Sequence, residues 1–289
     1  MSAIAITDYN GMYWVPSLFL ASQDSKNPEN PEDKWVKWIF GLEIWFVMDI
    51  NASTIWKSIW NICLLAENDT WYHNMMELVA YANQNWFSNG IAKLDLNILK
   101  EKSEWVIVFS WWELSWIAKM QASWESDEKI REVYEMLKNI FKDKCYLEIT
   151  AQDESVHSVV KKCNQFIYTL SKQTNTKLIV NNDYRYLKSA DKETREVALS
   201  IKDGTKMYDI NRRSPEWKYH IMDWEEIRDI CIRNWYSAEE IDEWIENGYQ
   251  ISESINSKML LHQKLFPKYE TPDNIKEFYR KYWDKAIIE

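Results

Sequence analysis

Asp8 is the first residue whose position suggests chemistry. It follows the apolar run Ala3-Ile4-Ala5-Ile6-Thr7, which predicts a short strand buried on both faces. An acid at the carboxyl end of such a strand stands where barrels and open α/β sheets place their functional groups. Asn10-Gly11 then supplies turn residues. Asp8 is therefore a candidate site residue.

The thiols and imidazoles of the chain show no spacing typical of a metal or disulfide site. The cysteines are scattered without a CxxC pair, which indicates reduced thiols rather than a zinc ribbon or a disulfide framework. The histidines lie on predicted helices or late in the chain, and we expect them to be ordinary surface or packed side chains. These residues are Cys63, Cys145, Cys163, Cys231, His73, His157, His220 and His262.

Length and charge bound the class of protein. The chain has 289 residues, enough for one large domain with an appendage. Its net charge of -10 disfavours binding to nucleic acid by this chain alone. No signal peptide or long apolar run is present in the sequence, and we expect a cytoplasmic protein without membrane contact.

Glycine and tryptophan occur in unusual numbers. A typical chain of this length has roughly 20 glycines, whereas this one has 5 glycines and 18 tryptophans. Many of the tryptophans fall where a helix is expected to end or a strand to begin, positions that glycine favours. We hypothesise that many are glycines misread from a reassigned codon, whereas Trp38 and Trp244 fit apolar patterns and are genuine. The positions in question include Trp14, Trp35, Trp71, Trp86, Trp105, Trp235 and Trp283.

Strands and helices alternate along most of the chain, which predicts an α/β fold with a parallel sheet or barrel. After residue 223 the pattern becomes helical, and Ser237-Ala238-Glu239-Glu240 forms a capping box. We therefore predict one domain over residues 1–223 and a helical segment over 224–289. The expected strands span 3–8, 36–47, 61–66, 105–110, 145–149 and 177–181, and the expected helices 14–24, 72–84, 94–102, 126–142, 154–172 and 191–202.

Four motifs, in order, carry a resemblance to a known family. They are Ile6-Thr7-Asp8-Tyr9-Asn10-Gly11, Gly41-Leu42-Glu43, Asn61-Ile62-Cys63-Leu64-Leu65-Ala66 and Asn182-Asp183-Tyr184-Arg185-Tyr186-Leu187. As a set they resemble the PHP domain of bacterial DNA polymerase III alpha subunits. The resemblance implies a PHP-type distorted (β/α) barrel, truncated at its N-terminus, with a C-terminal helical segment that leads toward the polymerase body. The chain looks like a fragment that lacks the family's first strand unit and palm.

The resemblance also implies a remnant of the PHP site, formed by Asp8, Tyr9, Glu43, Asn61, Asp183 and Arg185. Active members of the family bind divalent metal (Mg, Zn or Mn) through several histidines and acids. Here Tyr9, Asn61 and Arg185 stand at histidine positions. We expect no metal or other cofactor; if a metal binds, its ligands are Asp8, Glu43 and Asp183. Arg185 is expected to neutralise these acids.

Three functions remain open. The first is a non-catalytic PHP portion of a replicative DNA polymerase III alpha subunit, whose whole protein would be a DNA-directed DNA polymerase (a nucleotidyltransferase). Its partners would be the rest of that subunit, other replisome subunits and a proofreading exonuclease, with DNA contact only through the full-length polymerase. The second is a metal-dependent PHP phosphoesterase. The third is a tryptophan-rich binding module, which requires tryptophans in one row on one face.

Overall fold

The structure is a computed structural model that describes most of the chain. The described residues are 3–24, 36–48, 60–85, 87–88, 91–104, 106–110, 116–123, 125–210, 212, 217–256, 275, 277, 280 and 281. Contacts group residues 1–258 into one compact unit and residues 259–289 into a second. The domain boundary expected at residue 223 stays a prediction.

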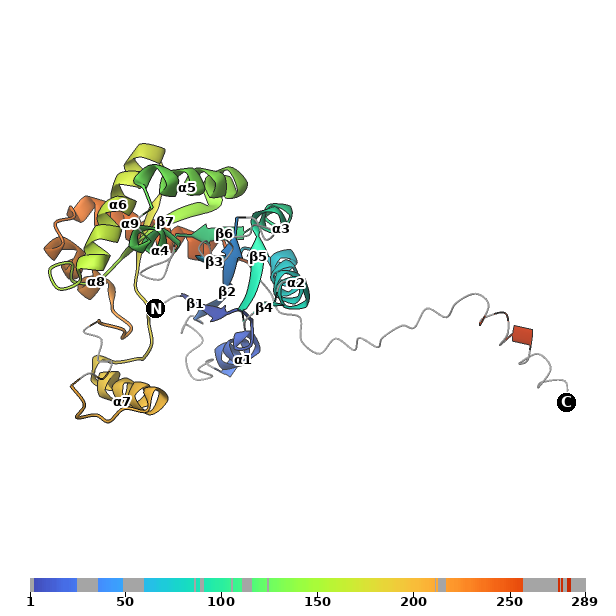
Figure 1. Cartoon of the computed structure of the whole chain (residues 1–289), viewed down its shortest axis with the longest axis horizontal. Helices are drawn as coiled ribbons and strands as arrows, with labels where there is room; N and C mark the ends of the chain where they lie inside the picture. The colour runs from blue at the N-terminus through green and yellow to red at the C-terminus, as the bar shows by residue number, and fades with distance from the viewer. Residues whose placement is uncertain are drawn as a thin grey trace. The chain divides into compact units, whose positions relative to one another are not determined.

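The described strands form one mixed sheet (Figure 1). The strand order is β4-β5-β2-β3-β6-β7-β8, and β1 pairs with β2 beside this path. β3 runs antiparallel to both β2 and β6, whereas β1–β2, β2–β5, β6–β7 and β7–β8 are parallel. The strands are β1 (Ala3–Tyr9), β2 (Lys37–Val47), β3 (Trp60–Ala66), β4 (Phe87–Ser88), β5 (Ile91–Asp95), β6 (Val106–Phe109), β7 (Cys145–Thr150) and β8 (Leu178–Asn181). The predicted α/β class with a distorted, incomplete barrel is confirmed.

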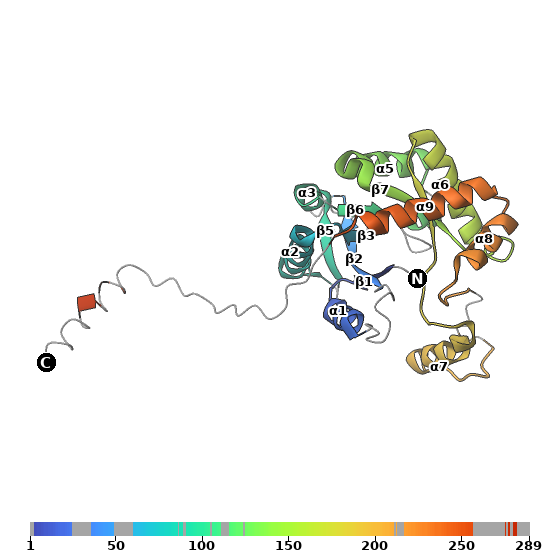
Figure 2. The same ribbon diagram turned by 180° about the vertical axis from the view of Figure 1, so that it is seen from behind.

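The helices cover the sheet and extend beyond it (Figure 2). They are α1 (Val15–Asp24), α2 (Asp69–Asn85), α3 (Leu96–Glu101), α4 (Trp116–Ala122), α5 (Asp127–Phe141), α6 (Ser158–Thr174), α7 (Lys192–Asp203), α8 (Trp224–Arg233) and α9 (Ala238–Ser254). The predicted capping box is confirmed, because Ser237 Oγ accepts from Glu240 N and the Glu240 carboxylate accepts from Ser237 N. None of the described helices has the length and apolar character needed to cross a bilayer.

Strand β2 separates the core from the candidate site. Phe40, Leu42 and Ile44 lie on one face and are fully buried. Glu43 and Trp45 alternate with them and therefore point to the other face. The alternation of side chains along a single strand thus places a charged group beside the core.

Several local expectations differ from the structure. β1 is only half-buried, because among the described strands it pairs with β2 alone. The helix expected over 94–102 is preceded by a strand, β5, that extends to Asp95, and α4 falls in a segment where no element was predicted. Helix α6 begins at Ser158, four residues later than expected. The difference at residues 91–95 lies where a short apolar run suits either a strand or a helix.

Two helices end in the same motif with different residues. Helix α7 ends at Gly204, whose φ is +67°, with Thr205 N donating to Ser200 O at 2.9 Å. After α8, Trp235 has a φ of +71° and Tyr236 N donates to Cys231 O at 3.2 Å. This left-handed cap favours glycine, which lacks the Cβ that strains it. Trp235 therefore occupies a glycine position, which supports the hypothesis of misread glycines.

The two tryptophans expected to be genuine are packed. Trp244 is 3% exposed and meets the ring of Tyr236 edge-on at 5.0 Å. Trp38 stacks on Phe40, with ring centroids 4.3 Å apart. Both side chains contribute apolar contacts that a glycine would lack.

Candidate functional site

Glu43 and Asn61 form the centre of the site on neighbouring strands. The antiparallel register pairs Glu43 with Cys63 and Trp45 with Asn61, so all four side chains share one face. Asn61 Nδ2 donates to Glu43 Oε1 at 2.6 Å. Burial raises the pKa of Glu43, although the bond from Asn61 and the nearby cations Arg185 and Lys119 oppose that shift. The Glu43 carboxylate is thus held in a place that disfavours its charge.

Lys119, from helix α4, joins this pair. Its Nζ donates to Asn61 Oδ1 at 2.9 Å and lies 3.7 Å from the centroid of the Trp45 ring. Burial lowers the pKa of Lys119 to about 8, and the attraction of Glu43 opposes that shift. Asn61 therefore connects an ammonium and a carboxylate while the indole face stabilises the cation.

Tyr9 covers one side of the same cluster. Its ring meets the Trp45 ring edge-on at 5.7 Å. Burial raises the pKa of Tyr9 to about 12, opposed by a hydrogen bond with Asn61, so the phenol stays protonated at neutral pH. A neutral phenol is a weak metal ligand compared with imidazole.

Asp183 and Arg185 follow strand β8 and form a direct ion pair. Arg185 Nε lies 2.6 Å from Asp183 Oδ2. The Asp183 side chain is 8% exposed and that of Arg185 47% exposed. Burial raises the pKa of Asp183, and Arg185 opposes the shift. Because Glu43 is influenced by both Asp183 and Arg185, the two acids belong to one cluster.

Asp8 lies apart from these groups. The register pairs Asp8 with buried Leu42, whereas it pairs Tyr9 with Glu43. Asp8 Oδ2 accepts a hydrogen bond from Trp14 N at 2.6 Å, within the turn that follows β1. The structure brings Tyr9, Asn61, Glu43, Asp183 and Arg185 together, and directs Asp8 to the turn. We call the set Tyr9, Glu43, Asn61, Lys119, Asp183 and Arg185 the cation cluster.

Glu148 is a further acid beside the cluster that sequence reasoning missed. It lies on β7 and is 2% exposed; the charge of Asp183 raises its pKa, and its own charge raises the pKa of Cys63. Burial raises its pKa to about 7, opposed by a hydrogen bond from Asn181. The sequence could have indicated this residue, because Glu148 is a carboxylate between Leu147 and Ile149 in an apolar strand. Lys119 gave no comparable signal, because its helix was not predicted.

The described histidines lie in other surroundings. His220 Nε2 is 2.8 Å from Glu226 Oε2. His157 packs against Trp217, and His73 against Tyr72. His262 lies outside the described residues. No described histidine therefore takes part in the cation cluster.

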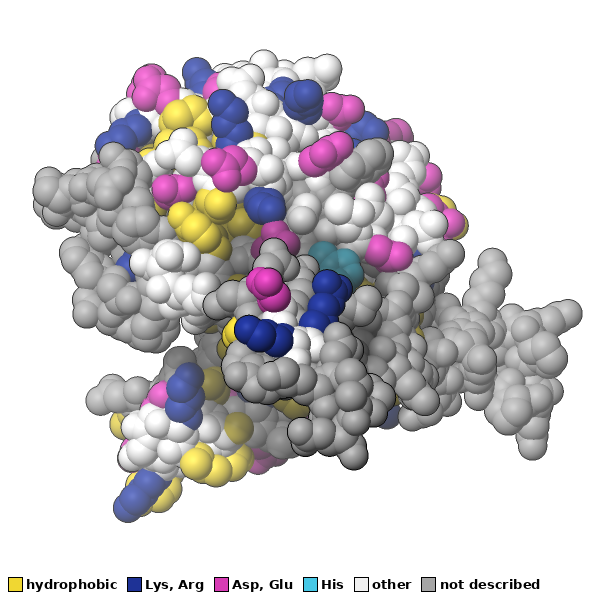
Figure 3. All heavy atoms as spheres, turned by 90° about the vertical axis from the view of Figure 1, so that its right-hand side faces the viewer, with side chains coloured by type: hydrophobic (Ala, Val, Ile, Leu, Met, Phe, Trp, Pro, Cys, Tyr) yellow, Lys and Arg dark blue, Asp and Glu magenta, His cyan; other side chains and the backbone are white. Residues whose placement is uncertain are grey.

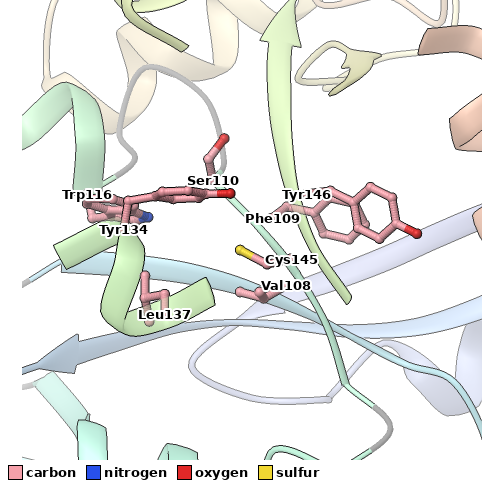
Figure 4. A pocket seen from close by; sticks show the side chains of 8 residues that line it. All are labelled: Val108, Phe109, Ser110, Trp116, Tyr134, Leu137, Cys145 and Tyr146. Carbon is pink, nitrogen blue, oxygen red and sulfur yellow. The ribbon is translucent and has the colours of Figure 1, made fainter. Parts of the chain in front are cut away.

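A small cavity lies between α4, α5, β6 and β7 (Figure 4). Its volume is about 10 Å³, and Trp116, Tyr134 and Cys145 are among its lining residues. The four cysteines are buried and free, and burial raises the pKa of the Cys145 thiol to about 12. Such a volume holds about one water molecule, so this cavity is a packing gap rather than a ligand site.

A comparison with protein-family models matches residues 1–152 to the PHP domain. The chain belongs to the PHP domain family. The match covers the strands that carry Tyr9, Glu43, Asn61 and Glu148, as well as the helix that carries Lys119. Most of the cation cluster is therefore part of the PHP domain itself.

Curated relatives extend the similarity beyond the PHP match. The DNA polymerase III subunit alpha of Pseudomonas aeruginosa is 21% identical over 281 residues, 95% of this chain and 22% of the relative. That of Campylobacter jejuni is 25% identical over 235 residues, 77% of this chain and 18% of the relative. That of Escherichia coli K12 is 21% identical over 285 residues, which are 96% of this chain and 22% of the relative. The chain spans about a fifth of the length of these relatives.

PHP domains are typically metal-dependent, and the cation cluster does not fit a divalent ion. Glu43 is bonded to Asn61, and Asp183 to Arg185. The ammonium of Lys119 lies near Glu43 and would repel a metal ion. Across the part of the chain that the structure describes, no three His, Cys, Asp or Glu side chains gather as metal ligands. No chemical step through a metal follows from this arrangement.

Proposed function

We propose that this chain is a non-catalytic PHP domain of a replicative protein related to the DNA polymerase III alpha subunit, and that it serves as a scaffold. The observation that carries the proposal is the pair of internal cations, Lys119 and Arg185, beside the acids Glu43 and Asp183. A catalytic PHP site uses bound metals to activate water and to shield phosphate. Here side-chain cations supply the positive charge without offering an open coordination position.

The partners follow from this role. The relatives are polymerase subunits a little over four times as long as this chain, so a PHP domain of this kind supports the remaining polypeptide. The family resemblance adds a proofreading exonuclease and other replisome subunits as partners. Side chains of both signs alternate on the face shown in Figure 3, where the described lysines and arginines form no broad patch. This surface and the net charge of -10 suit protein contacts better than DNA contacts.

Metal content and turnover test the proposal. The purified chain is analysed for zinc, manganese and magnesium, and its melting temperature is compared with and without EDTA and with added Mn²⁺. We expect less than stoichiometric metal, an unchanged melting temperature and no hydrolysis of p-nitrophenyl phosphate. Stoichiometric metal together with EDTA-sensitive hydrolysis would instead establish the phosphoesterase.

The phosphoesterase remains the second candidate because one observation favours it. Glu43, Asp183 and Glu148 interact electrostatically within one cluster, and acids of this kind bind divalent ions when no side-chain cation competes. The tryptophan-rich module has weaker support. Trp116 and Trp244 are buried in different helices, whereas Trp14 and Trp235 are exposed on separate turns. They do not form one row.

A further inference from the structure

Lys119 is held in a defined position within the cation cluster. Its neighbours on α4, Ala118 and Met120, are 5% and 1% exposed, so the helix is anchored in the core. The lysine side chain extends from α4 to strand β3, where Nζ donates to Asn61 Oδ1 at 2.9 Å. The amine therefore has one fixed set of neighbours, unlike the amine of a lysine that moves freely in solvent.

The two contacts of the amine leave its lone pair available for reaction. Asn61 Nδ2 donates to Glu43 Oε1 at 2.6 Å, which fixes the amide so that Oδ1 faces Lys119. The Trp45 ring, whose centroid is 3.7 Å from Nζ, offers a negative π face. Both groups accept from the nitrogen or attract its positive charge. A neutral amine attacks electrophiles through its lone pair, which neither contact engages.

The surroundings also favour the neutral form of this amine. Burial lowers the pKa of Lys119 to about 8, and the carboxylate of Glu43 opposes that shift. At pH 7.5 about a quarter of the molecules would therefore carry a neutral amine, against about 0.1% for an ordinary lysine. A desolvated lysine of this kind is an activated nucleophile.

Lys119 combines this activation with access to solvent. Its side chain is half-buried, and Tyr9, on one side of the cluster, is 48% exposed. Among the described lysines, Lys93 also has a pKa lowered by burial, but it is only 2% exposed and closed to reagents. The four cysteines are buried, and burial raises the pKa of each thiol. These thiols are poor nucleophiles by comparison.

We propose that Lys119 is a modification site that accepts an acyl group from small acyl phosphates. The lone pair of Nζ attacks the carbonyl carbon and forms a C–N bond, the C–O bond to phosphate breaks, and phosphate leaves with the electron pair. One proton of the amine passes to water. A small donor suits a half-buried amine, and the half-exposed guanidinium of Arg185 in the same cluster attracts the phosphate group.

Acylation would change the balance of charge in the cluster. The product is an uncharged amide, so the reaction removes the cation that lowers the pKa of Glu43. The remaining N–H of the amide can still donate to Asn61. The modification therefore alters the charge of the site while leaving one of its hydrogen bonds available. This inference does not depend on the proposed scaffold function.

Acetylation rates measured on the full chain test the proposal. The chain is incubated with acetyl phosphate, and the rate at each lysine is followed by mass spectrometry of its peptides. The comparison residue is Lys102, whose side chain is 33% exposed and whose Nζ lies 2.7 Å from Glu77. At pH 7.5 we expect Lys119 to react roughly tenfold faster, because its larger neutral fraction outweighs the weaker nucleophilicity of a less basic amine. Its rate should level off above about pH 8.

Two variants change the activation of the amine in opposite directions. Asn61→Asp places a carboxylate beside the ammonium and should slow acetylation of Lys119 several-fold at pH 7.5. Glu43→Gln removes a charge that stabilises the ammonium and should speed it. The matched control is Asn83→Asp, because Asn83 makes an exposed bond to Val79 O on α2, away from the cluster; its rate at Lys119 stays unchanged. Melting temperatures show that each variant is folded.

The native chain alone can overturn the proposal, even if a variant does not fold. Equal rates at Lys119 and Lys102, or a rate at Lys119 that still rises steeply between pH 9 and 10, would show that the amine is not activated. An unchanged rate in folded Asn61→Asp would also contradict it. The proposed function fails separately, through stoichiometric metal and phosphoesterase turnover, which these rates do not measure.

Discussion

The cation cluster and a network of uncharged amide side chains differ in how their buried polar groups are paired. The amide network comprises Gln152, Asn164, Asn182 and Asn234. Asn164 accepts from Thr150 N and donates to Thr150 O, both at 3.0 Å, and donates to Glu154 at 2.9 Å. Asn234 similarly connects Glu154 N to Gln152 O. The four amide side chains carry no charge, so their hydrogen bonds to one another and to the backbone do not change at moderate pH.

The cation cluster instead contains ionisable groups whose charges burial disfavours. The pKa values of Glu43 and Asp183 are raised by burial even with Arg185 nearby, and that of Lys119 is lowered. Perturbed ionisable groups of this kind are typical of functional sites and of their remnants. The comparison teaches that the amide network stabilises the fold through paired hydrogen bonds, whereas the cation cluster keeps ionisable groups where burial disfavours their charge. Substitutions in the two regions should therefore differ in their effects on stability.

The largest effect is expected in the amide network. Asn164→Ala removes one acceptor and two donors from a side chain that is 1% exposed, and leaves the amide of Thr150 without its partner. We expect the free energy of unfolding to fall by about 3 to 4 kcal/mol, measured by urea denaturation. The control is Asn83→Ala, which breaks an exposed bond to Val79 O. A loss below about 1 kcal/mol for Asn164→Ala contradicts the importance of the network.

The next effect concerns pH. The pKa of Glu148 is about 7 when folded, against an ordinary value of 4.5. Because the folded carboxyl holds its proton more tightly, its contribution to stability is full below 4.5 and is lost as pH rises through 7. The change is on the order of 3 kcal/mol. Glu148→Gln should flatten the pH dependence measured by urea denaturation between pH 4 and 8. If the pH dependence of the variant matches that of the native chain, a group other than Glu148 is responsible for it.

A smaller effect is expected when one cation is removed. Lys119→Met leaves Asn61 Oδ1 without its donor and Glu43 without a neighbouring positive charge. We expect a loss of about 1 to 2 kcal/mol. Arg185→Ala should cost about 0.5 to 1 kcal/mol, since the guanidinium is half exposed. In a Glu43→Gln background the cost of Lys119→Met should shrink. If it stays the same, the two groups do not interact.

The smallest effect is a gain in stability. Trp235→Gly removes a side chain that is 95% exposed and relieves a φ of +71°. We expect stabilisation of about 1 kcal/mol, seen as a higher melting temperature. By contrast, Trp244→Gly replaces a buried tryptophan and should destabilise the fold strongly. A loss of stability in Trp235→Gly would argue against glycine at this position.

The elements were predictable where periodicity was long. Helix α5 has a clear apolar stripe and a Ser126 cap, and its predicted bounds agree with Asp127–Phe141 within one residue. Strand β3, 7 residues that are all buried, was also found. Helix α4, which contributes Lys119, was missed because its 7 residues are too few to show a period. The same short helix therefore hid a member of the candidate site.

The sequence by itself determined the α/β alternation, the residue types at Tyr9, Asn61 and Arg185, and the unusual glycine and tryptophan counts. Only the tertiary structure decided how the charges are paired. Asn61 connects Lys119 to Glu43 across β3 and α4, residues 58 positions apart, while Asp8 bonds to its own turn. Local patterns record periodicity and turn chemistry, but burial and the distance between charges depend on which strands pair. Those two quantities set the pKa values that distinguish a metal site from one filled by side-chain cations.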